Sequence, residues 1–162
     1  MSRAIVADAG PLIALARIGR MELLSGLFEQ VLIPEAVREE LKPDSDRPGA
    51  CELRLALAPG KWLKTRKLRA HKPLGSMLDA GENQAILLAL QVKAPLLIDD
   101  LKGRRVGIAA GLPVIGTGRI LIEAKKKGLI EEISPVLEQL AEAGYRISER
   151  LVKRLLELSG EG

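Results

Sequence analysis

Short runs of consecutive apolar residues alternate with amphipathic stretches from one end of the chain to the other. A strand buried on both faces reads as a continuous apolar run, whereas a helix shows apolar residues three and four apart. The runs predict strands at 5–6, 31–33, 62–63, 94–100 and 112–117. The stretches between them predict helices at 11–27 with a break near Gly19, from Pro34 onward, and at 50–59, 78–92 and 101–111. This alternation predicts an α/β fold with a parallel sheet covered on both faces.

Residues 134–160 predict two further amphipathic helices, separated near Gly144. The apolar face of the last helix carries Leu151, Val152, Leu155 and Leu158. These residues are expected to pack on the body of the protein, on a second copy or on a partner protein. Helices with such stripes usually pack in a core.

The length of 162 residues suits one domain, here residues 1–162. Apolar residues make up 47% of the chain, and no apolar run approaches the roughly 18 residues that a bilayer span requires. The start "MSRAIVADAG" lacks the features of a secretory signal. The single Cys51 cannot form an internal disulfide and is predicted to be a small packed residue. A cytoplasmic protein with no membrane partner is expected.

Basic residues gather in two stretches, although the net charge is only +4. Residues 60–72 carry six Lys and Arg and no acid, and residues 101–128 carry seven against one acid, Glu123. Such segregation suits a polyanionic partner. Solvated helix faces and strand edges remain the alternative for either stretch alone.

Acidic residues follow two of the predicted strands. Asp8 ends the first strand, and Asp99 and Asp100 end "LLIDD". Because ligand sites of open parallel sheets lie beyond the carboxyl ends of the strands, these acids are expected at one edge. Glu82 in the first turn of its helix and Glu39 or Glu40 at the end of another are expected to join them.

Several carboxylates in one place repel one another, and a divalent cation removes the conflict. Oxygen ligands suit Mg²⁺ and Mn²⁺, whereas one Cys and one His make a zinc site improbable. Each acid also has a structural interpretation. Asp8 and Asp100 are placed to cap helices, Asp79 and Glu82 have the spacing of a capping box, and Glu39 and Glu40 could be solvated helix acids.

Five stretches taken together resemble the PIN-domain family, specifically small prokaryotic PIN-like proteins related to VapC-type toxin ribonucleases. They are "VADAGPLIAL", "LIPEAVREEL", "LDAGENQAILLAL", "LLIDDLKGRRVG" and "LPVIGTGRILIEAKKKGLI". The resemblance runs over about 4–133 as a core, with 134–162 as C-terminal helices. It implies a three-layer α/β/α sandwich and an acidic site that binds Mg²⁺ or Mn²⁺ and cleaves RNA.

The resemblance also implies roles for single residues. The family's first three acids match Asp8, Glu40 and Glu82, and its last acidic element matches Asp99 and Asp100, between which the sequence does not choose. Asp8 and one of the adjacent pair are expected to anchor the metal, with Glu40 and Glu82 holding it directly or through water. Just past "IDD", three cations are expected either to contact the substrate backbone or to form a solvated face: Lys102, Arg104 and Arg105.

Three departures from the family pattern keep a second interpretation open. Glu82 stands where Asp is common, Gly10 stands where a small hydroxyl residue is common, and "IDD" replaces a Thr or Ser before the last acid. The alternative to a nuclease is a catalytically weak PIN-like module that binds nucleic acid or protein. VapC-type relatives imply a homodimer and an antitoxin-like partner. His71 is expected to be a surface or phosphate-contacting residue, and Trp62 a packing residue.

Overall fold

The computed structural model describes residues 3–69, 72–74 and 77–162, so the expectation for His71 lies outside the described residues. Five strands form one parallel sheet: β1 (Ala4–Ala7), β2 (Gln30–Ile33), β3 (Leu63–Thr65), β4 (Leu96–Leu97) and β5 (Val114–Ile115). Their order is β3-β2-β1-β4-β5. The helices of the described residues are α1 (Ala9–Arg17), α2 (Glu22–Leu27), α3 (Glu35–Leu41), α4 (Ala50–Leu57), α5 (Ala80–Val92), α6 (Leu101–Ala109), α7 (Thr117–Lys126), α8 (Ser134–Glu142) and α9 (Glu149–Ser159).

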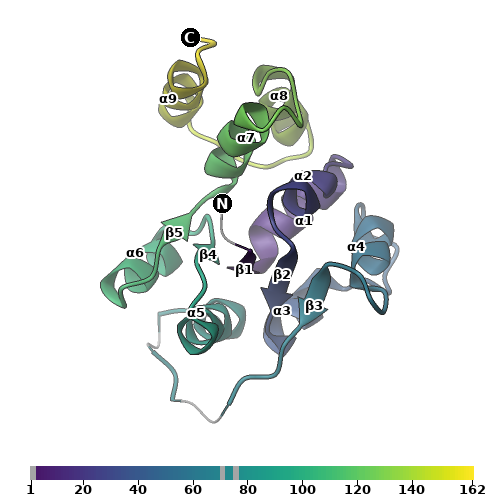
Figure 1. Cartoon of the computed structure of the whole chain (residues 1–162), viewed down its shortest axis with the longest axis vertical. Helices are drawn as coiled ribbons and strands as arrows, with labels where there is room; N and C mark the ends of the chain where they lie inside the picture. Colours follow the sequence, from purple (N-terminus) through teal and green to yellow (C-terminus); the bar gives the residue numbers. More distant parts are fainter. Residues whose placement is uncertain (1–2, 70–71, 75–76) are drawn as a thin grey trace.

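Helices cover both faces of this sheet, with α1 and α2 on one side and α5 and α6 on the other (Figure 1). Helices α7, α8 and α9 group together at the top of Figure 1, on the same side of the sheet as α1 and α2, and α7 packs on α2. The predicted three-layer α/β/α fold with a parallel sheet is therefore confirmed.

The two central strands bring the ends of β1 and β4 together. Val6 pairs with Leu96 and Ala7 with Leu97, and all four residues are fully buried. The N–H of Asp8 donates to the carbonyl of Leu97 at 2.9 Å. The residues that follow the two strands consequently emerge at the same edge of the sheet, as the apolar runs predict.

The last helix is anchored by one buried side chain, Leu155, and by the partly buried Val152 and Leu156, which pack against the core. Leu155 is 5% exposed and packs where a Cβ on Gly118 of α7 would stand, whereas Leu151 and Leu158 are 47% and 53% exposed. Leu155 therefore packs on the body of the protein. Because Leu151 and Leu158 are exposed, packing of this face on a second copy or on a partner protein stays a prediction.

The acid next to the C-terminus fixes the end of the chain. Glu161 accepts hydrogen bonds from the N–H groups of Ile133 and Ser134 at 2.9 and 3.1 Å, at the start of α8. It also pairs with Lys125 of α7 at 2.9 Å. Glu161 thus connects the end of the chain, just after α9, to α7 and to the start of α8.

Of the two packing predictions for single residues, one is confirmed and one is wrong. Trp62 is half-buried against the core, as predicted. The prediction that Cys51 is packed is wrong, because its side chain lies on the exposed side of α4. Strands β4 and β5 have two residues each and are shorter than the predicted strands at 94–100 and 112–117. No helix of the described ranges is both long and apolar enough to cross a membrane.

Candidate active site

Asp8 directly follows β1 and is buried at the sheet edge where β1 and β4 end. It occupies the N-cap position of α1 but makes no capping hydrogen bond with its side chain, so the helix-cap interpretation does not account for it. The residue is only 8% exposed. Burial raises the pKa of Asp8 to about 7; the N–H of Ala9 opposes this, and the charges of Glu40, Asp79 and Asp100 add to the increase.

Glu82 is the second buried carboxylate and is held from two sides. Its Oε1 accepts from the N–H of Asp79 at 3.0 Å, while Oδ1 of Asp79 accepts from the N–H of Glu82 at 2.8 Å, which is a complete capping box. The other side of Glu82 forms a hydrogen bond with the carboxyl group of Asp100. Burial and this bond raise the pKa of Glu82 to about 7.

Asp100 is an exposed acid that serves two partners. It caps α6 by accepting from the N–H of Gly103 at 3.0 Å, as the spacing predicts. Its hydrogen bond with Glu82, followed by the N–H of Gly103, lowers the pKa of Asp100.

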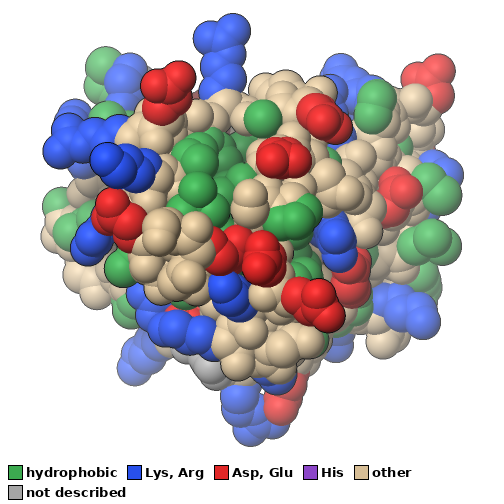
Figure 2. Space-filling view, turned by 90° about the horizontal axis from the view of Figure 1, so that it is seen from above, with side chains coloured by type: hydrophobic (Ala, Val, Ile, Leu, Met, Phe, Trp, Pro, Cys, Tyr) green, Lys and Arg blue, Asp and Glu red, His purple; other side chains and the backbone are tan. Residues whose placement is uncertain are grey.

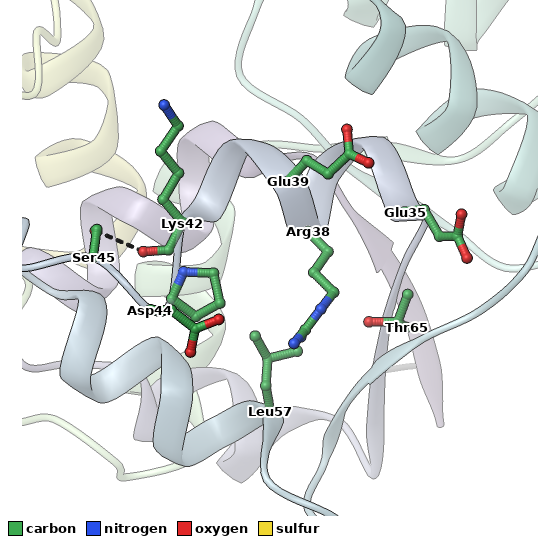
Figure 3. A pocket seen from close by; sticks show the side chains of 9 residues that line it. Glu35, Arg38, Glu39, Lys42, Asp44, Ser45, Leu57 and Thr65 are labelled. Carbon is green, nitrogen blue, oxygen red and sulfur yellow. Dashed lines mark hydrogen bonds between the residues drawn. The ribbon is translucent and has the colours of Figure 1, made fainter.

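Glu40 approaches the same place from the end of α3. A Cβ atom built on Gly81 would overlap Oε1 of Glu40, so the present position of the Glu40 carboxylate requires glycine at position 81. Partial burial and the charge of Asp79 raise the pKa of Glu40. Its neighbour Glu39 points instead into a separate cleft beside α3 (Figure 3).

These five carboxylates are called the acid cluster below: Asp8, Glu40, Asp79, Glu82 and Asp100. Two are buried at its base and three are exposed at its rim. The predicted site omits Asp79, which the sequence analysis treats only as a cap. The spacing of Asp79, three residues before Glu82, could have indicated that Asp79 belongs to the site. The N-cap and N3 side chains of a capping box lie close together.

Asp99 faces away from the acid cluster. Its Oδ1 accepts from the N–H of Thr117 at 2.8 Å, and its Oδ2 accepts from the Thr117 hydroxyl at 2.6 Å and from the Tyr145 hydroxyl. The structure therefore brings four of the five predicted acids together and separates Asp99 from them.

The three cations predicted to contact substrate differ in their surroundings. Arg104 donates from its guanidinium to the carbonyl of Ile98 at 3.0 Å and is half-buried. Lys102 and Arg105 are exposed, and the charge of Lys102 contributes to the lowered pKa of Asp100. Arg104 thus helps to hold the end of β4, whereas Lys102 and Arg105 stay available to solvent.

The donors of the acid cluster suit a hard divalent cation by their chemistry. All are carboxylate oxygens, the ligand type that Mg²⁺ and Mn²⁺ prefer. Two of the five have a pKa near 7 because burial and like charges disfavour ionisation, and a bound cation would reverse that effect. Within residues 3–69, 72–74 and 77–162, no three His, Cys, Asp or Glu side chains already stand in a metal-binding arrangement. A Mg²⁺ ion held here would take one or two of these carboxylates as direct ligands and contact the others through water.

Comparison with known families agrees with this architecture. A family model described as a PIN domain (DUF3368) matches residues 4–161, nearly the whole chain. The chain belongs to the PIN-domain family. PIN domains are commonly nucleases and typically use divalent metals. No protein of curated function matches the chain in sequence.

Two solved structures resemble the fold. A PilT N-terminus domain protein from the hyperthermophilic archaeon Sulfolobus solfataricus P2 is 16% identical, with a TM-score of 0.56 over 75% of this chain and 92% of that one. A domain of a functionally unknown protein from Methanocaldococcus jannaschii DSM 2661 is 21% identical, with a TM-score of 0.47 over 70% and 90%. At these identities the likeness concerns the fold alone, and only the first is close enough to support it.

Proposed function

We propose that the protein is a divalent-cation-dependent endoribonuclease whose active site is the acid cluster. The observation that carries this proposal is Asp8. A buried carboxylate without a capping role, with a pKa raised to about 7 by burial and by three neighbouring acids, is costly to the fold. Such clusters of perturbed acids occur preferentially at functional sites.

The residues of the chain divide the work of the site. Asp8 and Asp100, from the ends of β1 and β4, would hold Mg²⁺ or Mn²⁺, with Glu40 and Glu82 as further direct or water-mediated ligands. Asp79 fixes the backbone and side chain of Glu82 through the capping box. Gly81 admits Glu40. When bound, such a cation acidifies water and neutralises charge on the phosphate that is attacked.

A second candidate is a PIN-like module that binds RNA or protein without turnover. Gly10 favours it, because the residue two positions after Asp8 supplies no hydroxyl group. The homodimer and the antitoxin-like partner implied by the family resemblance stay predictions.

The test is cleavage of a mixed set of structured and single-stranded RNAs in Mg²⁺, Mn²⁺ or EDTA, by the wild type and by Asp8→Asn. The nuclease predicts cation-dependent cleavage that is lost in the variant and in EDTA. Equal cleavage by both proteins would point to a contaminating enzyme. No cleavage by folded wild type would favour the binding module.

A further inference from the structure

Four exposed cations lie in and just after β3, and they are called the basic tract: Lys64, Arg66, Lys67 and Arg69. The ion pairs within the described part of the chain involve none of them. Their charges are therefore offered to solvent without an internal acid to neutralise them.

The backbone of the basic tract is held at both ends. The N–H of Arg66 extends the β3–β2 pairing by donating to the carbonyl of Ile33 at 2.8 Å. At the other end the side-chain amide of Gln91 on α5 accepts from the N–H of Arg69 at 3.1 Å and donates to its carbonyl at 3.5 Å. The four cations thus project from an anchored segment.

A cleft of about 420 Å³ separates the basic tract from the second half of α5 and is called the α5 cleft. Its walls are Arg66, Lys67 and Arg69 on one side and Leu88, Gln91 and Val92 on the other. No acid lines it. Three cations facing an uncharged wall form a surface that suits phosphate groups.

Two other surfaces of the molecule have mixed charge. The larger cleft beside α3, of about 840 Å³, contains Glu35, Glu39 and Asp44 together with Arg38 and Lys42 (Figure 3). The face in Figure 2 carries acidic and basic side chains interspersed around a hydrophobic patch. Neither surface offers a polyanion the uniform charge of the α5 cleft.

Much of the second basic stretch, residues 101–128, is used to hold the fold together. Its internal partners are Glu123 for Arg119 and Lys126, Glu161 for Lys125, the carbonyl of Gly26 for Lys127 and the carbonyl of Ile98 for Arg104. The two basic stretches therefore have different roles, although they look alike in sequence.

Helix α5 connects the α5 cleft to the acid cluster. Glu82 lies in its first turn and Gln91 lies nine residues later, a separation of about 13 Å along the helix axis at 1.5 Å per residue. A stacked strand with about 3.4 Å per nucleotide covers this distance with about four nucleotides.

Resting on the proposed nuclease function, we propose that the basic tract and the α5 cleft bind the phosphate backbone of single-stranded RNA about four nucleotides from the bond at the acid cluster. Phosphate contacts position a strand without reading its bases. The cleft therefore determines where the strand lies and contributes affinity, while the acid cluster performs the chemistry.

The test is binding of a fluorescent twelve-nucleotide RNA to the full chain in EDTA, measured by anisotropy over a range of salt concentrations. The variant is Arg66→Ala/Lys67→Ala/Arg69→Ala. Each phosphate contact to a single strand contributes about 0.7 to the salt slope, so three lost contacts reduce the slope by about 2 and the affinity on the order of 10- to 100-fold at 0.1 M salt.

Two control variants distinguish binding at the α5 cleft from a general effect of positive charge. Arg146→Ala/Arg150→Ala/Lys153→Ala removes three exposed cations elsewhere and should bind within about twofold of wild type. Arg66→Lys/Arg69→Lys keeps the charge and should retain the salt slope. The proposal is overturned if wild type fails to bind at low salt, if the tract variant binds like wild type, or if the distant variant loses as much affinity.

Cleavage kinetics test the RNA interface separately from the nuclease function. For long RNAs the tract variant should raise KM and leave kcat unchanged, while a dinucleotide, too short to reach the cleft, should be cleaved equally by both proteins. If the binding result holds and wild type cleaves nothing, the nuclease function fails and the RNA interface stands. If wild type cleaves and the tract variant has an unchanged KM, the interface fails and the nuclease stands.

Discussion

The hydroxyl group of Tyr145 donates a hydrogen bond to the carboxylate of Asp99, which lies 46 positions earlier in the chain. The same carboxylate accepts two hydrogen bonds from Thr117 at the start of α7. Burial, with the charge of Asp99, raises the pKa of Tyr145 above its ordinary value, so the hydroxyl keeps its proton and remains a donor. Asp99 thereby ties the end of β4 to the C-terminal helices.

Tyr145→Phe should destabilise the fold without changing the chemistry. The substitution removes one donor from a partly buried charged acceptor, which costs about 1.5–3 kcal/mol of unfolding free energy. Urea denaturation at pH 7 measures this cost. The kcat of any cation-dependent cleavage should stay within about twofold, because Tyr145 does not contact the acid cluster. Unchanged stability would contradict the role of this hydrogen bond.

The stability of the metal-free protein should fall as pH rises from about 4 to about 7. The pKa of Asp8 is raised from 3.8 to about 7, so the folded state binds a proton in this window that the unfolded state has released. The cost on reaching pH 7 is of order 4 kcal/mol. Asp8→Asn should make this profile shallower, with the contribution of Glu82 remaining in the same window, and be more stable than wild type above pH 7. A profile that is the same in both proteins would contradict the burial of an ionisable Asp8.

Mg²⁺ should stabilise the wild type more at pH 8 than at pH 5, because the carboxylates that bind it are then ionised. At 100 times its Kd a ligand adds about 2.7 kcal/mol to the free energy of unfolding. Thermal unfolding with and without Mg²⁺ at the two pH values measures the difference. Equal shifts at both pH values, or an equal shift in Asp8→Asn, would show that the cation binds elsewhere.

Gly81→Ala should impair the site while leaving the fold largely intact. A Cβ atom at position 81 overlaps Oε1 of Glu40, and the flexible end of Glu40 must turn away. We expect at least a tenfold loss in Mg²⁺ affinity or in cleavage. Gly10→Ala is the matched control, because nothing lies within 4 Å of a Cβ there and the helical position should gain up to about 1 kcal/mol. Full retention of metal affinity in Gly81→Ala would exclude Glu40 from the site.

Glu161→Ala should destabilise the C-terminal helices. Although burial opposes it, the N–H groups of Ile133 and Ser134 and the Lys125 ammonium lower the pKa of Glu161 to about 2. Its contribution is therefore present above pH 4.5 and lost as pH falls toward 2. At pH 7 the variant should lose about 1–3 kcal/mol. Glu157→Ala, which removes an exposed partner of Arg154, should lose less than about 0.5 kcal/mol. Equal losses would contradict the structure.

The sequence predicts the scaffold well because the scaffold depends on local patterns. The apolar runs ending at Ala7 and Ile98 predict that Asp8 and the adjacent pair of aspartates reach one edge, and the register of β1 and β4 agrees. The capping box of Asp79 and Glu82 is likewise a matter of spacing. These features need no knowledge of distant contacts.

Contacts between distant residues decide the rest. Whether Asp99 or Asp100 joins Asp8 depends on Thr117 and Tyr145, which bind one of the two neighbours and leave the other. Likewise, the partner that neutralises Lys125 is Glu161, 36 positions away. No pattern within a short stretch reveals either choice.

We propose that the acid cluster is one cation-dependent active site that includes Asp100 and excludes Asp99. The most direct measurement compares Asp100→Asn with Asp99→Asn in Mg²⁺-dependent RNA cleavage and in Mg²⁺ titration, with folding of each variant verified by circular dichroism. We predict that Asp100→Asn loses cleavage and Mg²⁺ affinity, whereas Asp99→Asn is less stable but retains both while folded. Loss of both properties in folded Asp99→Asn, with full retention in Asp100→Asn, would contradict the account.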